Sequence, residues 1–195
     1  MPSAEPEDES PLAKCSYTKR SSGRGGEGGA GGQAWASMSS PIGTIFIGAS
    51  GGKLTSVGFV NPDLPGEAGL EDREALARAA HQIEEYFLGK RMRFDLPMAP
   101  QGSSFQLEVW EAVSEIAFGE TASYAAVAQA LGRPGAARAV GRALSGNPLL
   151  LVIPCHRVLA ARGAGGWAGG VDRKTWLLAH ERGASSLLLV DHPAL

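Results

Sequence analysis

Residues 123–144 read SYAAVAQALGRPGAARAVGRAL, which is two short amphipathic segments around a break that contains two glycines and a proline. Apolar residues recur at helical spacing in both segments, namely Tyr124, Val127 and Leu131, followed by Val140 and Leu144. Two short helices joined by a tight turn predict a helix-turn-helix, whose second helix enters a DNA groove when the motif binds DNA. Many helix hairpins bind nothing, so this pattern alone leaves DNA binding open.

The charge distribution favours a DNA partner more than the net charge does. The 195 residues have a formal net charge of −2, but residues 121–182 contain eight basic residues and only two acidic ones, a local charge of +6. Seven of the eight are arginines, whose planar guanidinium suits phosphates and base edges. A merely solvated basic surface explains the same excess, so a motif has to decide between the two interpretations.

The chain before the helix-turn-helix predicts a tail and a small domain. Residues 1–34, which include Cys15, contain too little apolar surface to offset the ordering of the backbone, so we expect a disordered tail. Residues 35–100 predict a small α/β N-terminal domain, an antiparallel sheet with one helix. Its expected elements are strands at 40–49 and 53–60 joined by a Gly51-Gly52 hairpin turn, a helix at 71–88 after a loop at 61–69, and a third strand at 91–96.

Residues 101–186 predict a mostly helical, winged-helix-like DNA-binding domain built on the helix-turn-helix, with a loose tail at 187–195. Its expected elements are helices at 105–116, 123–131 and 136–144, an apolar run at 149–153, a glycine-rich loop at 163–170, and a final helix that Asp172 caps and that reaches Glu181.

Composition limits the cellular setting and the cofactors. Cys15 and Cys155 form neither a disulfide framework nor a zinc-binding spacing, and no apolar run is long enough to cross a bilayer. The acidic start of the chain resembles neither a secretory signal nor a transit peptide. We therefore expect a soluble intracellular protein, nuclear in a eukaryote and cytoplasmic in a bacterium, with no metal, no cofactor and no membrane partner.

In the stretch LLLVIPCHRV, residues 149–158, Cys155 comes at the end of an apolar run. A cysteine after an apolar run is usually a small core residue. His156 and Arg157 follow it, however, and cationic neighbours favour the thiolate. A carboxylate from Glu181 on the final helix would orient the imidazole as a base. Spacing alone leaves both interpretations open, and it leaves a cysteine hydrolase as another, although such a nucleophile normally has a histidine distant in sequence and an oxyanion donor.

The loop segment GAGGWA, residues 163–168, nominally matches the dinucleotide-binding fingerprint. That fingerprint needs a strand before it and an acidic residue at the end of a second strand about twenty residues later. Here Glu181 falls in a predicted helix instead. A flexible loop over a pocket is therefore the favoured interpretation.

Several ordered elements resemble the O6-alkylguanine-DNA alkyltransferases, also called methylated-DNA–protein-cysteine methyltransferases. The most specific is PCHRV at residues 154–158, which resembles the alkyl-acceptor motif of that family. The others are FGETASY at 118–124, AARAVG at 136–141, NP at 147–148, GG at 169–170 and WLLAHE at 176–181. Strong similarity covers about residues 105–182, and weaker similarity covers 39–100.

The resemblance implies direct-reversal DNA repair on double-stranded DNA, by a monomer. The alkyl group of O6-alkylguanine, and of O4-alkylthymine, would move irreversibly to Cys155 from a flipped-out base, in a single turnover. His156 would take the thiol proton through a water and Glu181 would orient the imidazole. Tyr124 would lie beside the base and its 3′ phosphate, and Asn147 would brace the turn before the cysteine.

The resemblance also implies a DNA interface and a base pocket. Arg138 would fill the space that the flipped base leaves, and the carbonyls of Cys155 and Val158 would accept from the guanine amine. The expected DNA contacts are Arg138, Tyr124, Ser123, Arg142, Ala139 and Arg157. The expected pocket residues are Val158, Trp167, Ala168 and Lys174.

Three departures from the family pattern are visible. Arg142 stands where members usually have a small residue, and Ala168 stands where some relatives have a hydroxyl. The zinc ligands of some animal members are not recognisable. The first two departures are the only support for an alternative function, a non-catalytic protein that senses alkyl lesions in DNA, and the presence of Cys155 argues against it.

Overall fold

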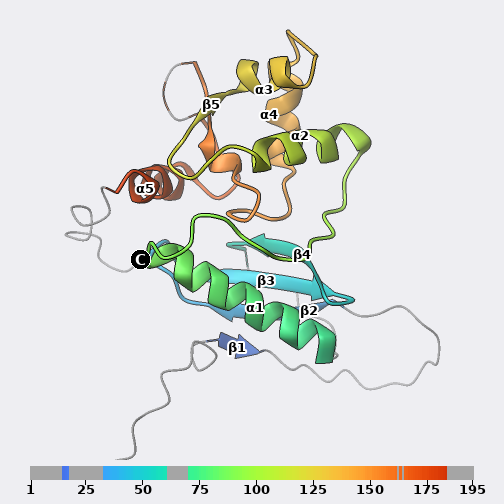
Figure 1. Ribbon diagram of the computed structural model, residues 1–195, viewed down its shortest axis with the longest axis vertical. Coiled ribbons are helices and arrows are strands. Elements are labelled where there is room, and N and C mark those ends of the chain that lie inside the picture. Colours follow the sequence, from blue (N-terminus) through green and yellow to red (C-terminus); the bar gives the residue numbers. More distant parts are fainter. Residues whose placement is uncertain (1–14, 18–32, 61–69, 162, 164, 184–195) are drawn as a thin grey trace, which may run out of the picture.

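The computed structural model describes residues 15–17, 33–60, 70–161, 163 and 165–183. Most of the predicted tail at 1–34, the predicted loop at 61–69 and the predicted tail at 187–195 lie outside these ranges. The described residues form two layers that meet along one face: a sheet covered by one helix, and a group of short helices (Figure 1). The predicted fold class, a small α/β domain followed by a helical DNA-binding domain, is confirmed.

The sheet of the first domain has four antiparallel strands in chain order. The strands are β1 (Cys15–Tyr17), β2 (Ala34–Met38), β3 (Ile45–Ser50) and β4 (Lys53–Gly58). Gly51 and Gly52 join β3 to β4 with φ of 59° and 73°, the positive values that a tight hairpin turn requires, so the predicted hairpin is confirmed. Strand β1 falls inside the segment predicted to be a tail, because its three residues pair with the edge of β2.

Helix α1 (Leu70–Phe87) covers one face of this sheet (Figure 1). Its inner face is apolar and fully buried, with Leu76, Ala79 and Ile83 at the spacing of one helix stripe. The predicted third strand at 91–96 is wrong. The amide side chain of Gln82 donates to the Asp95 carbonyl and accepts from the Asp95 N–H, both at 2.8 Å, so a side chain from α1 replaces a neighbouring strand there.

The second domain contains the predicted helices with small shifts of their ends. They are α2 (Ser104–Ser114), α3 (Tyr124–Ala130), α4 (Ala137–Ser145) and α5 (Val171–Glu181). Helices α3 and α4 pack on each other and both contact α2, which is the expected helix-turn-helix with a supporting helix. The cap of α5 differs from the prediction: Gly170 is the N-cap residue, and Asp172 lies in the first turn instead.

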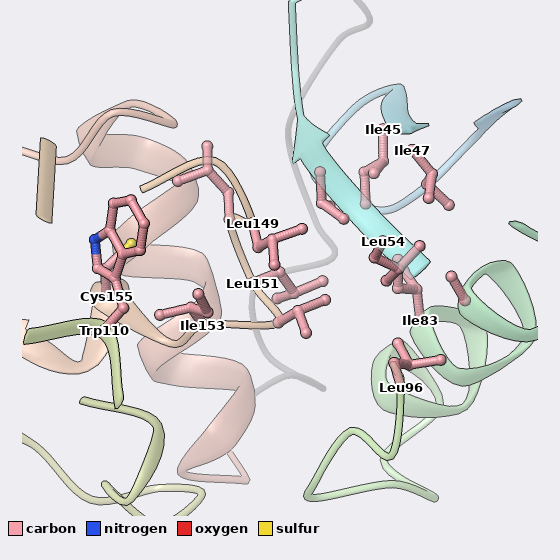
Figure 2. Packing of buried hydrophobic residues seen from close by; sticks show 14 of the residues in the cluster. Ile45, Ile47, Leu54, Ile83, Leu96, Trp110, Leu149, Leu151, Ile153 and Cys155 are labelled. Atoms are coloured by element: carbon pink, nitrogen blue, oxygen red, sulfur yellow. The ribbon is translucent and has the colours of Figure 1, made fainter. Parts of the chain in front are cut away.

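The apolar run before Cys155 joins the two domains. Val57 of β4 donates its N–H to the Pro148 carbonyl at 2.8 Å and accepts from the Leu150 N–H at 2.9 Å, so the run pairs with the sheet edge. Leu149, Leu151 and Ile153 are buried between the helices and the sheet (Figure 2). Packing against both domains therefore accounts for the composition of this run and fixes where it ends, at Cys155.

Candidate active site

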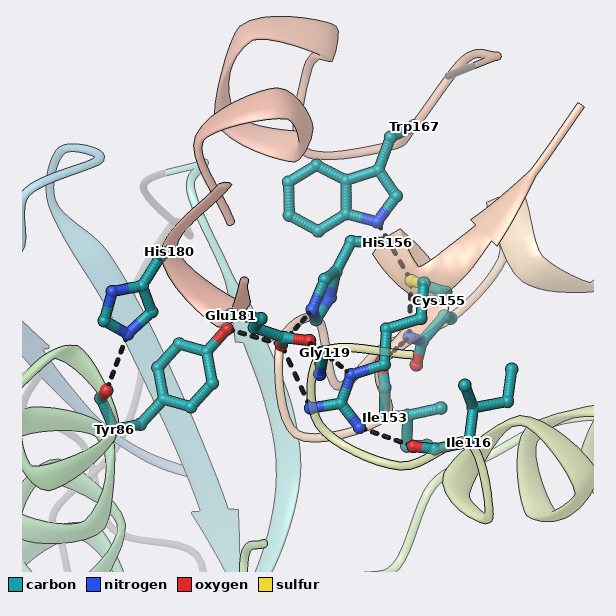
Figure 3. A network of polar contacts seen from close by, with 11 residues as sticks. Tyr86, Ile116, Gly119, Ile153, Cys155, His156, Trp167, His180 and Glu181 are labelled. Carbon is teal, nitrogen blue, oxygen red and sulfur yellow. Dashed lines mark hydrogen bonds and ion pairs between the residues drawn. The ribbon is translucent and has the colours of Figure 1, made fainter. Parts of the chain in front are cut away.

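Cys155 begins a one-turn 3-10 helix, Cys155–Arg157, at the end of the apolar run. Only 3% of the residue is exposed. Its Sγ accepts two hydrogen bonds, from Asn147 Nδ2 at 3.1 Å and from the indole Nε1 of Trp167 at 3.0 Å (Figure 3). A buried sulfur that faces two N–H donors is not a simple packing residue, because an apolar contact would not need them.

Asn147 has the geometry expected of a brace. Its Oδ1 accepts from the Leu149 N–H at 3.0 Å, and its Nδ2 donates both to the Ile153 carbonyl at 3.0 Å and to the Cys155 sulfur. The side chain is buried, so these bonds are protected from water. One amide therefore fixes both ends of the apolar run and points at the thiol.

Behind the cysteine, Glu181 is the centre of a buried polar network (Figure 3). Its Oε1 accepts from Tyr86 Oη at 2.7 Å, from Arg157 Nη2 at 3.0 Å, and contacts His156 Nε2 at 2.8 Å. Its Oε2 accepts from Arg157 Nε at 2.8 Å and from the Gly119 N–H at 3.1 Å. Burial alone would raise the pKa of Glu181, but the hydrogen bonds from His156 and Arg157 and the positive charge of Arg157 outweigh it and hold the pKa well below its usual range.

Arg157 is a correction to the sequence prediction of a DNA contact. It is buried, forms a two-point ion pair with Glu181, and donates through Nη1 to the Ile116 carbonyl at 2.6 Å. A buried carboxylate needs a counter-charge with its hydrogen bonds satisfied, and Arg157 supplies it. The guanidinium therefore stabilises the interior of the site and does not face a DNA surface.

His156 lies in the same turn as Cys155 and is fully buried, with its Nε2 2.8 Å from Glu181 Oε1. Burial lowers the pKa of His156 and the hydrogen bond to Glu181 opposes this only in part, so the imidazole is neutral near pH 7. With its Nε2–H directed at Glu181, its Nδ1 is an acceptor. Among the described residues, this Nδ1 is the one buried side-chain nitrogen or oxygen without a hydrogen-bond partner in the protein.

The ionisation of the thiol depends on opposing influences. Burial raises the pKa of Cys155, while the hydrogen bonds from Asn147 and Trp167 and the positive charge of Lys174 lower it. Lys174 is fully buried and donates to the Val158 carbonyl at 2.7 Å. Lys174 and Val158 were predicted to line the substrate pocket; both residues are buried, and neither is among the residues that line the cavity in front of Cys155.

A cavity of about 390 Å³ opens in front of Cys155. Its walls are Tyr124, Gly141, Leu144, Ser145, Gly166, Trp167 and Ala168. Tyr124 reaches the cavity because β5 (Ala122–Ser123), the strand directly before it, pairs in parallel with β6 (Val158–Leu159), the strand directly after the Cys155 turn. Burial raises the pKa of Tyr124, so its hydroxyl remains a proton donor at neutral pH.

The predicted DNA-contacting residues lie on or beside the same helix pair. Arg138 and Arg142 are exposed on α4, and Ala139 is half-buried between them. Ser123 is exposed and is the N-cap of α3, where its Oγ accepts from the Ala126 N–H at 3.0 Å. Because Gly141 and Ser145 of α4 also line the cavity, the basic helix and the cavity share one face.

Two parts of the site were missed by sequence reasoning. Tyr86 lies 95 residues before Glu181 and in the other domain, so no local pattern links them. Gly119 belongs to the FGETASY element, but its role as a backbone donor to Glu181 depends on the fold. Its φ of 81° and the 3.1 Å that would separate a Cβ from the Glu181 carbonyl explain why a glycine is present.

The described part of the chain contains no group of three or more His, Cys, Asp or Glu side chains able to hold a metal ion. In the same residues, no helix is both long and apolar enough to cross a membrane.

Comparison with known proteins identifies the family. Two family models match, the ribonuclease-like domain of 6-O-methylguanine DNA methyltransferase over residues 34–100 and its DNA-binding domain over 104–183. A methylated-DNA–protein-cysteine methyltransferase of Mycolicibacterium paratuberculosis is 43% identical over 159 residues, 79% of this chain and 96% of that protein. The inducible one of Bacillus subtilis is 39% identical over 152 residues, 77% of this chain and 85% of that protein.

Solved structures agree. Mycobacterium tuberculosis O6-methylguanine methyltransferase aligns with a TM-score of 0.68 at 35% identity, over 78% of this chain and 94% of that one. Mycobacterium tuberculosis OGT in complex with DNA aligns with a TM-score of 0.67 at 36% identity, over 76% and 92% of the two chains. The fold and site define a two-domain protein with a buried, hydrogen-bonded cysteine beside a helix-turn-helix. The chain belongs to the 6-O-methylguanine DNA methyltransferase family, which confirms the predicted resemblance.

Proposed function

We propose that this protein repairs alkylated DNA by transferring the alkyl group of O6-alkylguanine to the sulfur of Cys155. The observation that supports this most directly is the position of Cys155 at the base of a 390 Å³ cavity, with the His156–Glu181 pair at a 2.8 Å contact behind it. The names of its relatives point to the same reaction.

The transfer is an in-line displacement at an alkyl carbon. The thiol proton of Cys155 passes through a water to Nδ1 of His156, the buried acceptor that has no partner in the protein. Glu181 stabilises the imidazolium that forms. The thiolate then forms the new S–C bond while the C–O6 bond breaks, and the hydroxyl of Tyr124 donates a hydrogen bond to the guanine as negative charge moves onto it.

The substrate has to leave the duplex, because a stacked base is out of reach of the sulfur of a cysteine of which only 3% is exposed. The cavity walls contributed by α4 lie beside Arg138, which fills the vacated stack, while Ser123, Arg142 and Ala139 contact the DNA backbone. The carbonyls of Cys155 and Val158 accept from the guanine amine. The Val158 carbonyl already accepts from Lys174, but a carbonyl oxygen has a second lone pair.

The reaction is stoichiometric, because the thioether product has no easy route of hydrolysis. The protein acts as a monomer on double-stranded DNA that contains O6-alkylguanine or O4-alkylthymine. It works in the compartment that holds the genome, the cytoplasm of a bacterium or the nucleus of a eukaryote.

The decisive test is the intact mass of the protein after incubation with a duplex that contains one O6-methylguanine. We expect a gain of one methyl group, located on the Cys155 peptide, and no gain for Cys155→Ser at unchanged DNA affinity. A wild-type protein that binds the lesion but gains no mass would overturn the transferase function and support a lesion-sensing protein instead.

A further inference from the structure

Trp167, whose indole N–H donates to the Cys155 sulfur, is held by a residue of the other domain. Its ring lies edge-on to Phe59, which follows β4, with 6.0 Å between ring centroids and 65° between ring planes. The ring also lies edge-on to His156, again with 6.0 Å between ring centroids. Figure 3 shows the indole nitrogen directed at the sulfur.

Arg173 fixes both Phe59 and the loop that contains Trp167. Its guanidinium carbon lies 4.6 Å from the centre of the Phe59 ring, a cation–π contact. Its Nε donates to the Ile42 carbonyl of the first domain at 2.7 Å, and its Nη1 donates to the Gly169 carbonyl of the loop at 3.0 Å. One side chain at the start of α5 therefore ties the first domain to the active-site loop.

The loop backbone itself provides little restraint on the indole. Gly165, Gly166, Gly169 and Gly170 flank Trp167, and glycines leave the backbone the widest conformational choice. The ring lies so close to Gly169 that a Cβ at that position would collide with it. The orientation of the indole N–H thus depends on what packs against the ring.

We propose that Phe59 and Arg173 are positioning residues that hold the indole N–H of Trp167 on the Cys155 sulfur, so that the first domain governs how readily the thiolate forms. An N–H donor stabilises a thiolate much more than a thiol, and the effect is strong where water is excluded. Within the described part of the chain, two side chains donate to the sulfur, Asn147 and Trp167, so loss of the indole N–H leaves one side-chain donor. The consequence for alkyl transfer rests on the proposed function, whereas the effect on the thiol does not.

The test is the pH dependence of Cys155 alkylation by iodoacetamide, in the full chain without DNA, quantified on the Cys155 peptide by mass spectrometry. Trp167→Phe keeps an aromatic ring but removes the N–H, and should raise the pH midpoint by about one unit, a roughly tenfold slower reaction below the midpoint. Phe59→Leu and Arg173→Met should shift the midpoint in the same direction by a smaller amount.

The double variants decide whether Phe59 and Arg173 act through Trp167. In a Trp167→Phe background, Phe59→Leu and Arg173→Met should cause no further shift. Additive shifts, or unchanged midpoints in the single variants, would overturn the proposal. Phe46→Leu is the matched control. Phe46 lies on the neighbouring strand β3, and no ring contact between it and Trp167 is found in the described chain. The pH midpoint of the Phe46→Leu variant should therefore match that of the wild type.

Methyl transfer from the lesion-containing duplex separates this proposal from the proposed function. If the midpoints shift as expected but the wild type transfers no methyl group, the function fails and the positioning role stands. If the wild type transfers methyl groups and the midpoints do not move, the positioning role fails alone.

Discussion

The two sides of Cys155 are built in opposite ways. Behind the sulfur, Glu181, His156 and Arg157 are buried, and five hydrogen-bond donors converge on one carboxylate. In front of it lies a cavity lined in part by Gly141 and Ser145 of α4, the helix on which Arg138 and Arg142 are exposed. The charged groups, Glu181 and Arg157, are therefore held in a rigid, buried network, whereas the open cavity lies on the side from which a base would enter.

The two sides also differ in how they arise from the chain. Most of the front is local, because α3 and α4 are adjacent in sequence and form one helix pair, whereas the loop residues Gly166, Trp167 and Ala168 come from further along the chain. The back is assembled from residues 24 to 95 positions away from Glu181. Disruption of the back should therefore affect chemistry and stability together, whereas disruption of the front should affect the handling of DNA.

The largest effect is expected from Glu181→Gln, which removes the negative charge at the centre of the buried network behind Cys155. It leaves Arg157 buried without its counter-charge, so we expect the free energy of unfolding to fall by about 3 kcal/mol. Loss of imidazolium stabilisation should slow transfer roughly a hundredfold. Denaturant unfolding and single-turnover transfer measure the two effects. Glu111→Gln, on the exposed side of α2, is the control and should change neither.

The pH dependence of the free energy of unfolding tests whether the buried network behind Cys155 depends on ionised Glu181. The pKa of Glu181 is held below its ordinary value of 4.5, so its contribution is fully present above about pH 4.5 and is lost as the pH falls toward the folded-state pKa. His156, whose pKa is lowered from 6.5, adds a contribution that is lost in the same direction, beginning near pH 6.5. Unfolding measured from pH 7 to pH 3 should show the gap between wild type and Glu181→Gln closing below pH 4.5; a constant gap contradicts the ionised network.

Arg138→Ala tests how the side of the cavity formed by α4 handles DNA. If Arg138 occupies the stack that the base leaves, its loss should slow transfer from duplex DNA roughly tenfold, because part of the unstacking cost is no longer offset. Reaction with the free base O6-benzylguanine should be unchanged, since no base has to be flipped. Equal losses on both substrates would show that Arg138 acts on the chemistry instead.

Arg142→Ala should have a smaller effect. An exposed arginine on α4 that contacts one phosphate contributes about one unit to the salt dependence of DNA binding. Affinity measured between low and physiological salt should therefore fall less steeply in the variant, with transfer at saturating DNA unchanged. A tighter complex after substitution would indicate that Arg142 hinders the close approach of α4.

Ala168→Ser should have the smallest effect. Ala168 is exposed at the cavity rim, where a hydroxyl could donate to the departing O6. One added hydrogen bond in a solvated position is expected to accelerate transfer by about 1 kcal/mol or less, roughly fivefold at most. Single-turnover rates at saturating DNA give the answer, with Ala168→Val as a control that adds bulk but no donor.

The sequence predicted those parts whose cause is local. The helices were predictable because their apolar stripes are periodic, and the hairpin was predictable because Gly51 and Gly52 can adopt positive φ. The third strand was wrong because the partner of Asp95 is the side chain of Gln82, which no periodicity reveals. Arg157 was misassigned because a basic residue in a basic segment indicates a surface, whereas its partner lies 24 residues away in a buried carboxylate.

Tyr86 and Phe59 could not be predicted from the sequence for the same reason. Each belongs to the first domain, where the residues gave no chemical pattern, and each acts on the site only once the two domains meet. Cys155 and His156, in contrast, could be singled out from the sequence, because their motif is short and contiguous.

The pairing of β4 with residues 148–150 joins the sheet and the segment that carries Cys155 through backbone hydrogen bonds. The backbone bonds of Val57 to Pro148 and Leu150 cross from the first domain to the strand-like run that ends at the nucleophile. A chain divided between the domains would therefore lose hydrogen bonds on both halves and expose the apolar run to water. Heat should melt this protein in a single transition, and the alkyl acceptor should lose its reactivity at the temperature at which the sheet unravels.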